Sequence, residues 1–436
     1  MNGLALFELN KALLLDAEDP FPSRRDEFFI PPTGAPHFRT QECLYFTGNS
    51  LGLQPRKARE ALTTELDDWA QFGVEGHFQA KHPWVSYHER FARGLTHLVG
   101  AQPHEVVAMN ALTVNLHLLL VSFYRPEGRR KKIICEAKAF PSDQYALASQ
   151  VRYHGGNPEE DIIEIGARPG THAIDEADVE AALAEHAGEV ALVMMGGMQY
   201  FTGQWLDMPR IVKAAHSEGA LCGFDLAHAV GNVPLKLHDW NVDFACWCSY
   251  KYLNSGPGAV AGAFVHERHV KEEDIPRFEG WWGHNAQRRF LMESQFDSMG
   301  TAEAWQMSNA PVLNMAVHAI ALDQFVQAGM DNLRSKSLRL TAYLEAGIQA
   351  VAQANDVHLE IITPQDPARR GCQLSLVAHG FGKQLFERLT DAGVVVDWRE
   401  PNVIRMAPVP MYNTFEDIAR FVNVLKLSTA KAPLNA

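Results

Sequence analysis

The 436-residue chain predicts an α/β protein with a large domain on a mostly parallel sheet and a small C-terminal α+β domain. From about residue 100 to 265, apolar strand-like runs alternate with helical patterns. These strands are apolar along their whole length, which is typical of parallel sheets that are buried on both faces. Strand–helix–strand alternation with such strands therefore favours a parallel sheet covered by helices.

The predicted elements of the large domain follow in chain order. Residues 175–186 are expected to form a helix, and so are residues 208–218, where Pro209 falls in the first turn. Strands are expected at 132–137, 190–195, 221–224, 242–248 and 259–265.

The C-terminal part has a different order of elements. Apolar residues recur at helical spacing from about 311 to 350, which predicts a long helix that links the two domains. The remainder predicts a strand, a helix, two strands and a helix, at 373–378, 382–392, 394–397, 403–407 and 414–427. We therefore divide the chain into an N-terminal arm and segment (1–70), a large cofactor-binding domain (71–310) and the linking helix with the small domain (311–436). The proline-rich stretch Pro20–Pro36 is expected to be an extended arm.

Composition excludes several classes of protein. Hydrophobic residues make up 47% and charged residues 21%, which is the profile of a globular chain and not of a disordered one. The formal net charge of −13 argues against general binding of nucleic acid, although one local phosphate site is compatible with it. No segment has the pattern of a signal peptide or a membrane span, because charged or polar residues interrupt each apolar stretch.

The six cysteines are few for this length and lie in apolar, strand-like runs. They lack the spacing of a metal site, so no metal is expected, and they are interpreted as reduced, buried residues of a cytoplasmic protein.

The most informative stretch joins Asp225, at the end of one predicted strand, with Lys251, just after the next. Ligands of α/β sheets bind beyond the carboxyl ends of the strands, so both side chains can reach one crevice. Such a pair suits pyridoxal phosphate, which needs a lysine amine for a Schiff base and a carboxylate that keeps its ring nitrogen protonated. The pair alone is equally compatible with a strand-end Asp that caps a helix and a surface Lys.

Three further features favour the cofactor. Thr113 opens an apolar helical stretch whose free first-turn amides suit a phosphate, although Thr113 could also serve only as a helix cap. Phe140 and Asp143 follow a buried strand and could lie against the pyridine ring, with plain core packing as the alternative for Phe140. Tyr250 offers a phenol that can bind phosphate or move a proton.

Nearly the whole chain resembles the kynureninases, pyridoxal-phosphate hydrolases of fold type I, the aspartate-aminotransferase-like class. The resemblance rests on a series of motifs in order: Tyr45-Phe-Thr-Gly-Asn-Ser-Leu-Gly-Leu-Gln-Pro55, Asn110-Ala-Leu-Thr-Val-Asn-Leu-His117, Ala137-Lys-Ala-Phe-Pro-Ser-Asp143, Tyr200-Phe-Thr-Gly-Gln204, Gly223-Phe-Asp-Leu-Ala-His-Ala-Val-Gly231, Asp243-Phe-Ala-Cys-Trp-Cys-Ser-Tyr-Lys-Tyr-Leu-Asn254, Gly280-Trp-Trp-Gly-His284 and Ile404-Arg-Met-Ala-Pro-Val-Pro-Met-Tyr-Asn413.

The resemblance implies a role for each matched position. Lys251 would hold the cofactor and move protons, with Tyr250 and Asp225 as its catalytic partners. The implied cofactor-binding residues are Leu112, Thr113, Phe140, Pro141, Ser142, Asp143, Asp225, His228, Tyr250, Lys251, Trp281 and Asn309. Trp281 and Asn309 resemble residues that a neighbouring subunit contributes, which implies a homodimer with active sites at the interface.

Other matched positions concern the substrate. Arg405 resembles the arginine that grips the substrate α-carboxylate, with a structural ion pair as the alternative. His77, Ser50 and Asn309 resemble contacts to the aromatic ring in family members that accept 3-hydroxykynurenine, although His77 could equally be an ordinary surface residue. Gly196-Gly197 departs from a Ser-Gly pair that is frequent in the family, so any contact from that serine hydroxyl would be missing.

The implied reaction is hydrolytic cleavage of the Cβ–Cγ bond of L-kynurenine to anthranilate and L-alanine, and of the 3-hydroxy form to 3-hydroxyanthranilate and L-alanine. It would serve tryptophan catabolism through the kynurenine pathway or pyridine nucleotide biosynthesis. Two alternatives stay open: another pyridoxal-phosphate enzyme, such as a class V aminotransferase or a cysteine desulfurase, and a non-catalytic binding protein that has kept the fold.

Overall fold

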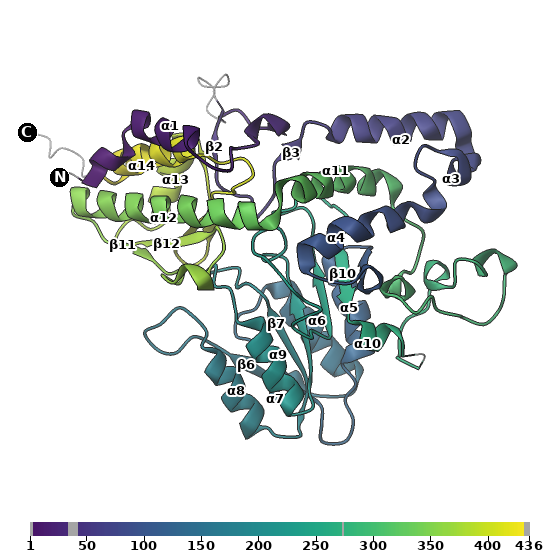
Figure 1. Ribbon diagram of the computed structural model, residues 1–436. Coiled ribbons are helices and arrows are strands. Elements are labelled where there is room, and N and C mark those ends of the chain that lie inside the picture. Colours follow the sequence, from purple (N-terminus) through teal and green to yellow (C-terminus); the bar gives the residue numbers. More distant parts are fainter. Residues whose placement is uncertain (1–2, 34–41, 273, 431–436) are drawn as a thin grey trace, which may run out of the picture. The chain divides into compact units, whose positions relative to one another are not determined.

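The computed structural model describes residues 3–33, 42–272 and 274–430. They form two compact units (Figure 1). The large unit consists of residues 57–200 and 206–327, and the small unit combines residues from 1–56, 201–205 and 328–436.

A seven-stranded sheet is the centre of the large unit. Its order is β4-β10-β9-β8-β7-β5-β6. The strands are β4 (Val106–Ala108), β5 (Lys132–Glu136), β6 (Ile162–Ile165), β7 (Val190–Gly196), β8 (Leu221–Asp225), β9 (Phe244–Trp247) and β10 (Gly262–Val265).

Five adjacent strands of this sheet, β9-β8-β7-β5-β6, are parallel, and β10 runs antiparallel to both of its neighbours. The prediction of a mostly parallel sheet is therefore confirmed. The carboxyl ends of the five parallel strands meet at one edge of the sheet, which is where ligands of such folds bind.

The large unit contains ten α-helices among the described residues. They are α2 (Ala58–Phe72), α3 (Gly76–Gln79), α4 (Ala92–Val99), α5 (Leu112–Phe123), α6 (Pro141–Tyr153), α7 (Pro158–Asp161), α8 (Glu176–Glu185), α9 (Met208–Ser217), α10 (Glu267–Val270) and α11 (Val312–Ala328). Of these, α4, α5, α7, α8 and α9 contact strands of the sheet. The start of α9 illustrates how the sequence determines where a helix begins. Asp207 caps the helix by accepting a hydrogen bond from the Arg210 amide, and Pro209 lies in the first turn, as predicted.

The core of the large unit lies on both faces of the sheet. Ile133 on β5 and Leu192 on β7 pack in one cluster with apolar residues of α5 and α6. Ile134 and Val193, which alternate with them and point to the other face, are also completely buried. Helices α8 and α9 pack side by side and contact the strands of the sheet (Figure 1). The central strands of the sheet are therefore buried on both sides, which explains why they are mostly apolar.

The small unit is built around a four-stranded antiparallel sheet of order β11-β12-β15-β14. Its helices are α1 (Leu9–Ala17), α12 (Met330–Asn355), α13 (Lys383–Asp391) and α14 (Phe415–Thr429). Its strands are β1 (Phe28–Phe29), β2 (Leu44–Tyr45), β3 (Gln54–Pro55), β11 (Leu359–Ile361), β12 (Leu374–Ala378), β13 (Val394–Val395), β14 (Asp397–Arg399) and β15 (Val403–Met406). Helix α14 packs against both α12 and α1, so the first helix of the chain shares a core with the last.

Two predicted elements were wrong in their extent. The single helix expected over 311–350 is two helices, α11 and α12, which are separated at Gly329 with its positive φ of 76°. The strand expected at 394–397 is also divided: β13 pairs in parallel with β2, whereas β14 pairs with β15. Helical periodicity continues across a glycine, so the sequence pattern did not reveal the first break.

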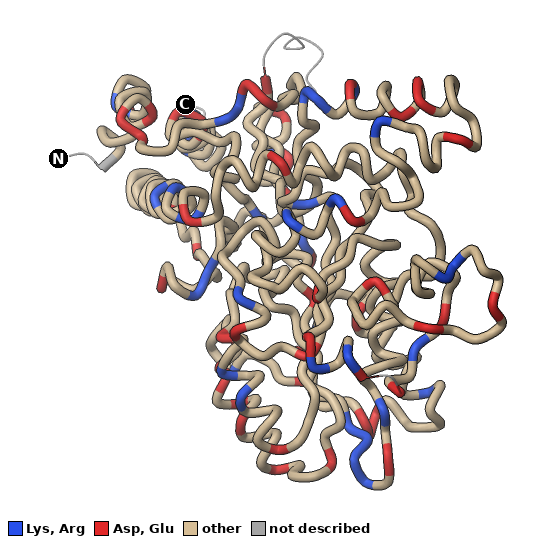
Figure 2. Tube along the Cα trace, turned by 45° about the vertical axis from the view of Figure 1, so that its right-hand side comes forward, with Lys and Arg blue, Asp and Glu red and all other residues tan. Residues whose placement is uncertain are grey.

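The division into units runs differently from the three sequence ranges. Residues 1–56 belong with the C-terminal elements, and α11 belongs almost entirely with the large unit. Of the predicted extended arm Pro20–Pro36, residues 34–36 lie outside the described residues, and the rest contains β1. Figure 2 shows Lys and Arg residues distributed among Asp and Glu residues in both units.

Candidate active site

Asp225 and Lys251 meet at the carboxyl edge of the large sheet. Asp225 is the last residue of β8, and Lys251 follows the end of β9, whose Cys246 pairs with Asp225 in the sheet register. Both residues line one cavity of about 210 Å³. The shared crevice predicted from their strand positions therefore exists in the structure.

The cavity gathers most of the predicted cofactor residues from separate parts of the chain. The predicted residues that line it are Leu112, Thr113, Phe140, Ser142, Asp143, Asp225, His228, Tyr250 and Lys251. Pro141, between Phe140 and Ser142, begins α6 and does not line the cavity. Sequence reasoning missed Glu136, Met198, Tyr200 and Ala227, which also line it, as does Gly196, the position where the family frequently has a serine. The position of Glu136 at the end of a predicted strand was the available signal.

Lys251 lies near three aromatic rings of the cavity. Its Nζ atom is 3.0 Å from Nε2 of His228. The same atom lies 5.7 Å from the ring centroid of Phe140 and 5.9 Å from that of Tyr250. Phe140 is 40% exposed and meets Tyr200 edge-on, so it forms part of the cavity wall and not of the core.

Three carboxyl groups gather at the strand ends. Burial raises the pKa of Asp225, while Lys251 and the amide of Ala227, which donates to Oδ1 at 2.7 Å, act in the opposite direction. Burial and the neighbouring Asp225 raise the pKa of Asp143 well above its ordinary value. Burial, followed by Asp225, raises the pKa of Glu136 to about 8. At this end of the cavity, Glu136 is therefore protonated at neutral pH, and the pKa of Asp143 is raised in the same direction.

The other end of the cavity is the start of α5. The residue before this helix, Ala111, provides no side-chain cap, so the first amides of α5 lack a side-chain acceptor. Leu112 and Thr113 are the first two residues of the helix and line the cavity. Free amides and a hydroxyl at a helix N-terminus form a binding site for an anion such as phosphate.

Tyr250 is the second predicted proton carrier. Burial, with Cys248 nearby, raises the pKa of its phenol above the ordinary value. The hydroxyl therefore stays protonated across the physiological range and can act as a hydrogen-bond donor.

These residues fit pyridoxal phosphate. Oε2 of Glu136 and Oδ1 of Asp143 are buried and make no hydrogen bond within the described residues, so the carboxyl end retains acceptors for a cationic ring nitrogen. The uncapped start of α5 retains donors for a phosphate, and Lys251 also lines the cavity. A donor set, an acceptor set and an amine in one cavity match the three reactive parts of this cofactor.

Besides Pro141, three predicted residues of the large unit do not line this cavity. Trp281 is 49% exposed, and Asn309 is also exposed. His77 lies in α3, where its Nδ1 atom is 2.9 Å from the Val74 carbonyl oxygen and its ring meets Trp84 edge-on.

Arg405 and Ser50 belong to the small unit, where they share one acceptor that sequence reasoning missed. Both the Arg405 guanidinium and the Ser50 hydroxyl donate to Oδ2 of Asp397, the latter at 2.9 Å. Arg405 is 1% exposed. The ion pair that was the alternative for Arg405 is thus present.

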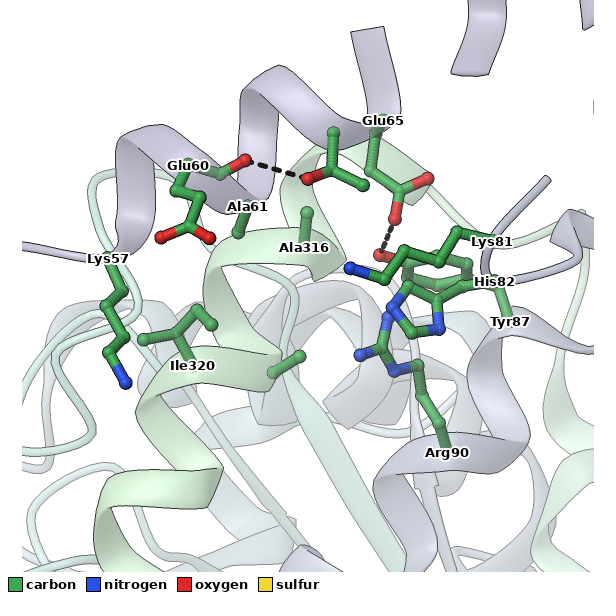
Figure 3. A pocket seen from close by; sticks show the side chains of 12 residues that line it. Lys57, Glu60, Ala61, Glu65, Lys81, His82, Tyr87, Arg90, Ala316 and Ile320 are labelled. Carbon is green, nitrogen blue, oxygen red and sulfur yellow. Dashed lines mark hydrogen bonds between the residues drawn. The ribbon is translucent and has the colours of Figure 1, made fainter. Parts of the chain in front are cut away.

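A second cavity of the large unit, of about 230 Å³, lies between α2 and α11 (Figure 3). Lys57, Lys81 and Arg90 are among its lining residues, and none of the predicted site residues is. Its buried carboxylate, Glu65, already accepts hydrogen bonds from Tyr87 and Trp84. This cavity therefore lacks the combination of groups found around Lys251.

Two groups of histidine and glutamate side chains bring their ligand atoms within 4.8 Å of one another. In the buried group, with His238 and His266, Glu105 accepts hydrogen bonds from the amides of Gln102 and Glu267, so its oxygens connect separate segments. The other group consists of His358, Glu360 and His379 in the small unit. Neither group lines the Lys251 cavity.

Comparison with known proteins shows the family. The kynureninase of Christiangramia forsetii is 52% identical over 94% of this chain and 96% of its own length. The kynureninase of Flavobacterium psychrophilum is 51% identical over 96% of this chain and 97% of its own length. This chain belongs to the kynureninase family.

Two family profiles match parts of the chain. The kynureninase C-terminal domain family matches residues 333–425, and the DegT/DnrJ/EryC1/StrS aminotransferase family matches residues 81–236.

The fold of this family member is shared with more distant enzymes. A cysteine desulfurase from Thermococcus onnurineus matches with a TM-score of 0.71 at 15% identity, over 88% of this chain and 94% of the other. A cysteine desulfurase from Escherichia coli matches with a TM-score of 0.72 at 15% identity, over 93% and 97%. These likenesses confirm the predicted fold type I architecture. Among the described residues, no helix combines the length and the hydrophobicity that a membrane span requires.

Proposed function

We propose that this protein hydrolyses L-kynurenine to anthranilate and L-alanine, and 3-hydroxy-L-kynurenine to 3-hydroxyanthranilate and L-alanine, with pyridoxal 5'-phosphate as cofactor. The observation that carries the proposal is the cavity in which Lys251, Asp225 and the start of α5 meet, in a chain of this family. Water supplies the hydroxyl group of the aromatic carboxylic acid and a proton of alanine, so the equation balances without an oxidant or a reductant.

The cofactor residues have distinct tasks. Lys251 would hold the cofactor covalently, Asp225 would pair with the ring nitrogen, and the first amides of α5 with the Thr113 hydroxyl would bind the phosphate. When bound, pyridoxal phosphate supplies a protonated ring that accepts the electron pair released at the substrate Cα. Asp225 supports this chemistry because a carboxylate favours the protonated form of a ring nitrogen beside it.

Proton transfer falls to groups near Lys251. The Lys251 amine, which lines the cavity, would act as the base that takes the α-proton of the substrate. His228, 3.0 Å from Nζ, holds the amine in position. Tyr250 keeps its proton and serves as a donor to the carbonyl oxygen or to the phosphate.

Arg405 binds the α-carboxylate of the substrate. A buried guanidinium offers a planar fork that matches a carboxylate, and in this structure that fork already holds the carboxylate of Asp397. The substrate carboxylate would share Arg405 with Asp397 or replace it.

His77, Ser50 and Asn309 contribute to recognition of the substrate ring and to the acceptance of a 3-hydroxyl group. The Ser50 hydroxyl donates to Asp397, the same carboxylate that pairs with Arg405. A change at Ser50 would therefore affect both the ring contact and the carboxylate contact.

The active form is a homodimer in which Trp281 and Asn309 act across the interface. Exposed apolar side chains around Trp281 support this: Phe290, which meets it edge-on, and Leu291 and Met292, which are 65% and 78% exposed. A molar mass of one chain for an active preparation would contradict the dimer.

The protein is cytoplasmic and acts in tryptophan catabolism or in pyridine nucleotide biosynthesis. Its six free cysteines are buried, which suits a reducing compartment. The same burial disfavours a cysteine desulfurase, because that reaction requires an accessible cysteine nucleophile.

The test is product analysis with both substrates. The protein, supplied with pyridoxal phosphate, is mixed separately with L-kynurenine and 3-hydroxy-L-kynurenine, and the aromatic product and alanine are quantified together. Equimolar formation of the two products supports the proposal and ranks the substrates. A spectral change of the cofactor without products would refute the proposed substrates but support the proposed cofactor. Absence of any spectral change would favour a non-catalytic binding protein.

A further inference from the structure

Glu136 is a buried carboxyl group of the cofactor cavity to which the reaction as described gives no task. It is the last residue of β5 and is only 3% exposed. Its Oε2 atom makes no hydrogen bond within the described residues, although it is fully buried. A buried acceptor without a partner costs folding free energy, so it calls for an explanation.

The glycine at position 196 creates the space that Glu136 occupies. Gly196 ends β7, the strand between β5 and β8, and pairs in register with Asp225. A Cβ atom at Gly196 would lie 3.1 Å from Oε1 of Glu136 and 3.5 Å from its Cδ and Oε2. The Glu136 side chain therefore lies across the bare backbone of β7, on the side towards Asp225. A serine here, which is frequent in the family, would fill part of this space.

Few charged groups surround the Glu136 side chain. Its strand partner on β6 is Ile165, and β7 presents Gly196, so neither neighbouring strand places a charge against it. Asp225 from β8 and Asp143 from α6 are the carboxyl groups with which it interacts. Lys251 is the only Lys or Arg among the described residues that line the cavity, and His228 is the only histidine. Three ionised carboxylates would exceed the charge that Lys251 can neutralise.

We propose that Glu136 is a positioning residue for the cofactor ring: held in the gap over Gly196, it acts through Asp225 and Asp143 to set how much negative charge faces the ring nitrogen. This inference rests on the proposed function only for the identity of the cofactor. At neutral pH Glu136 is protonated and leaves Asp225 as the principal negative charge. At alkaline pH it ionises and adds a second negative charge on the same side.

The consequence is a pH-dependent affinity for the cofactor. A positively charged ring nitrogen stabilises ionised Glu136, so cofactor binding releases its proton and becomes tighter as the pH rises through the Glu136 pKa of about 8. The substitution Glu136→Gln removes this proton but keeps the size and the neutral form of the side chain. The two proteins should bind pyridoxal phosphate equally at pH 6.5 and differ at pH 9.

The experiment titrates the apoprotein with pyridoxal phosphate at pH 6.5 and 9, without substrate, and follows tryptophan fluorescence. We expect the affinity ratio of the unaltered protein to E136Q to rise roughly tenfold between the two pH values, as for a charge pair in a partly screened cavity. E176Q, which changes a buried carboxyl group outside the cavity, is the matched control and should leave the ratio unchanged.

A second variant, G196A, allows the proposal to be tested if E136Q folds poorly. The added methyl group would lie 3.1 Å from Oε1 of Glu136, so the carboxyl group must shift, which should reduce the alkaline gain in affinity. A ratio that stays constant from pH 6.5 to 9 for both variants would overturn the proposal. Absence of any cofactor binding by the unaltered protein would instead refute the proposed function, so the two failures are distinguishable.

Discussion

Substitution of Asp243 should greatly lower the stability of the protein and leave the cofactor cavity unchanged. Asp243 directly precedes β9, at the edge of the sheet opposite the Lys251 cavity. Its two oxygens accept hydrogen bonds from His216 (2.8 Å), His269 (2.7 Å), Arg268 (2.6 Å) and the amide of Cys222 (2.7 Å). The carboxylate thus connects α9, β8 and α10. We predict that Asp243→Asn weakens the large unit but leaves the cofactor cavity intact.

The magnitude follows from this geometry. Each oxygen of Asp243 accepts two hydrogen bonds. In Asp243→Asn, the amide oxygen would still accept two, but the amide NH2 group would face the other two donors, which would lose their acceptor. Removing one member of a buried charged network costs about 3–5 kcal/mol. For a unit of this size the lower figure corresponds to a fall in the melting temperature of roughly 6–12 °C.

The pH dependence has a defined sign. Burial alone would raise the pKa of Asp243, but hydrogen bonds from His216 and His269, with Arg268, hold it below the ordinary value. A lowered folded-state pKa contributes stability above the unfolded pKa, and this contribution is lost as the pH falls through the folded-state pKa. The difference in stability between the unaltered protein and Asp243→Asn should therefore be greatest from about pH 5 to 8 and should become smaller below about pH 4.

The assay is calorimetry of the apoprotein at several pH values, with cofactor affinity measured in parallel. Asp239→Asn is the matched control, because Asp239 lies in the preceding loop, outside this network, and should change neither quantity. A melting temperature of Asp243→Asn equal to that of the unaltered protein would refute the reasoning. So would a loss of cofactor binding in a protein that is still fully folded.

Three further substitutions and one mass measurement test the rest of the structure. Lys251→Ala should abolish product formation and covalent retention of the cofactor, and retention through gel filtration would contradict its assignment. Arg405→Ala should raise KM roughly tenfold or more, because one charge-assisted hydrogen bond to the substrate is lost, and should change the cofactor absorbance little. An unchanged KM would refute the contact between Arg405 and the substrate carboxylate. Gly223→Ala should lower the melting temperature, because a Cβ there would lie 2.2 Å from the Phe244 ring, and unaltered stability would show that β8 and β9 can move apart. Light scattering should give the mass of two chains, whereas a single-chain mass in an active sample would contradict the dimer.

The sequence predicted five of the seven strands of the large sheet, because these strands are short, apolar and separated by clear helical patterns. It did not predict β4 and β6. The runs that became β5, β7 and β8 end where the structure ends them to within one or two residues. The strand ends in turn predicted that Asp225 and Lys251 would share a crevice. Periodicity was less informative where two helices follow one another, as at Gly329, and where a strand changes its partner, as between β13 and β14.

The site was predicted only where a residue type suggests its own chemistry. Lysine, aspartate and a helix start are recognisable in a sequence, whereas the space over Gly196 depends on three strands lying side by side. Glu136 was missed because its position at the end of a predicted strand, the available signal, does not reveal the space that receives its side chain. Asp397 was missed because an aspartate in a short strand does not by itself reveal its partners, Arg405 and the distant Ser50.

The most direct test of the central claim uses L-kynurenine in water labelled with oxygen-18. Hydrolysis of the Cβ–Cγ bond places one water oxygen in the carboxylate of the aromatic product and none in alanine. We predict anthranilate with one heavy oxygen atom, formed in equal amount with unlabelled alanine. Anthranilate without the label, or without alanine, would contradict a hydrolytic kynureninase reaction.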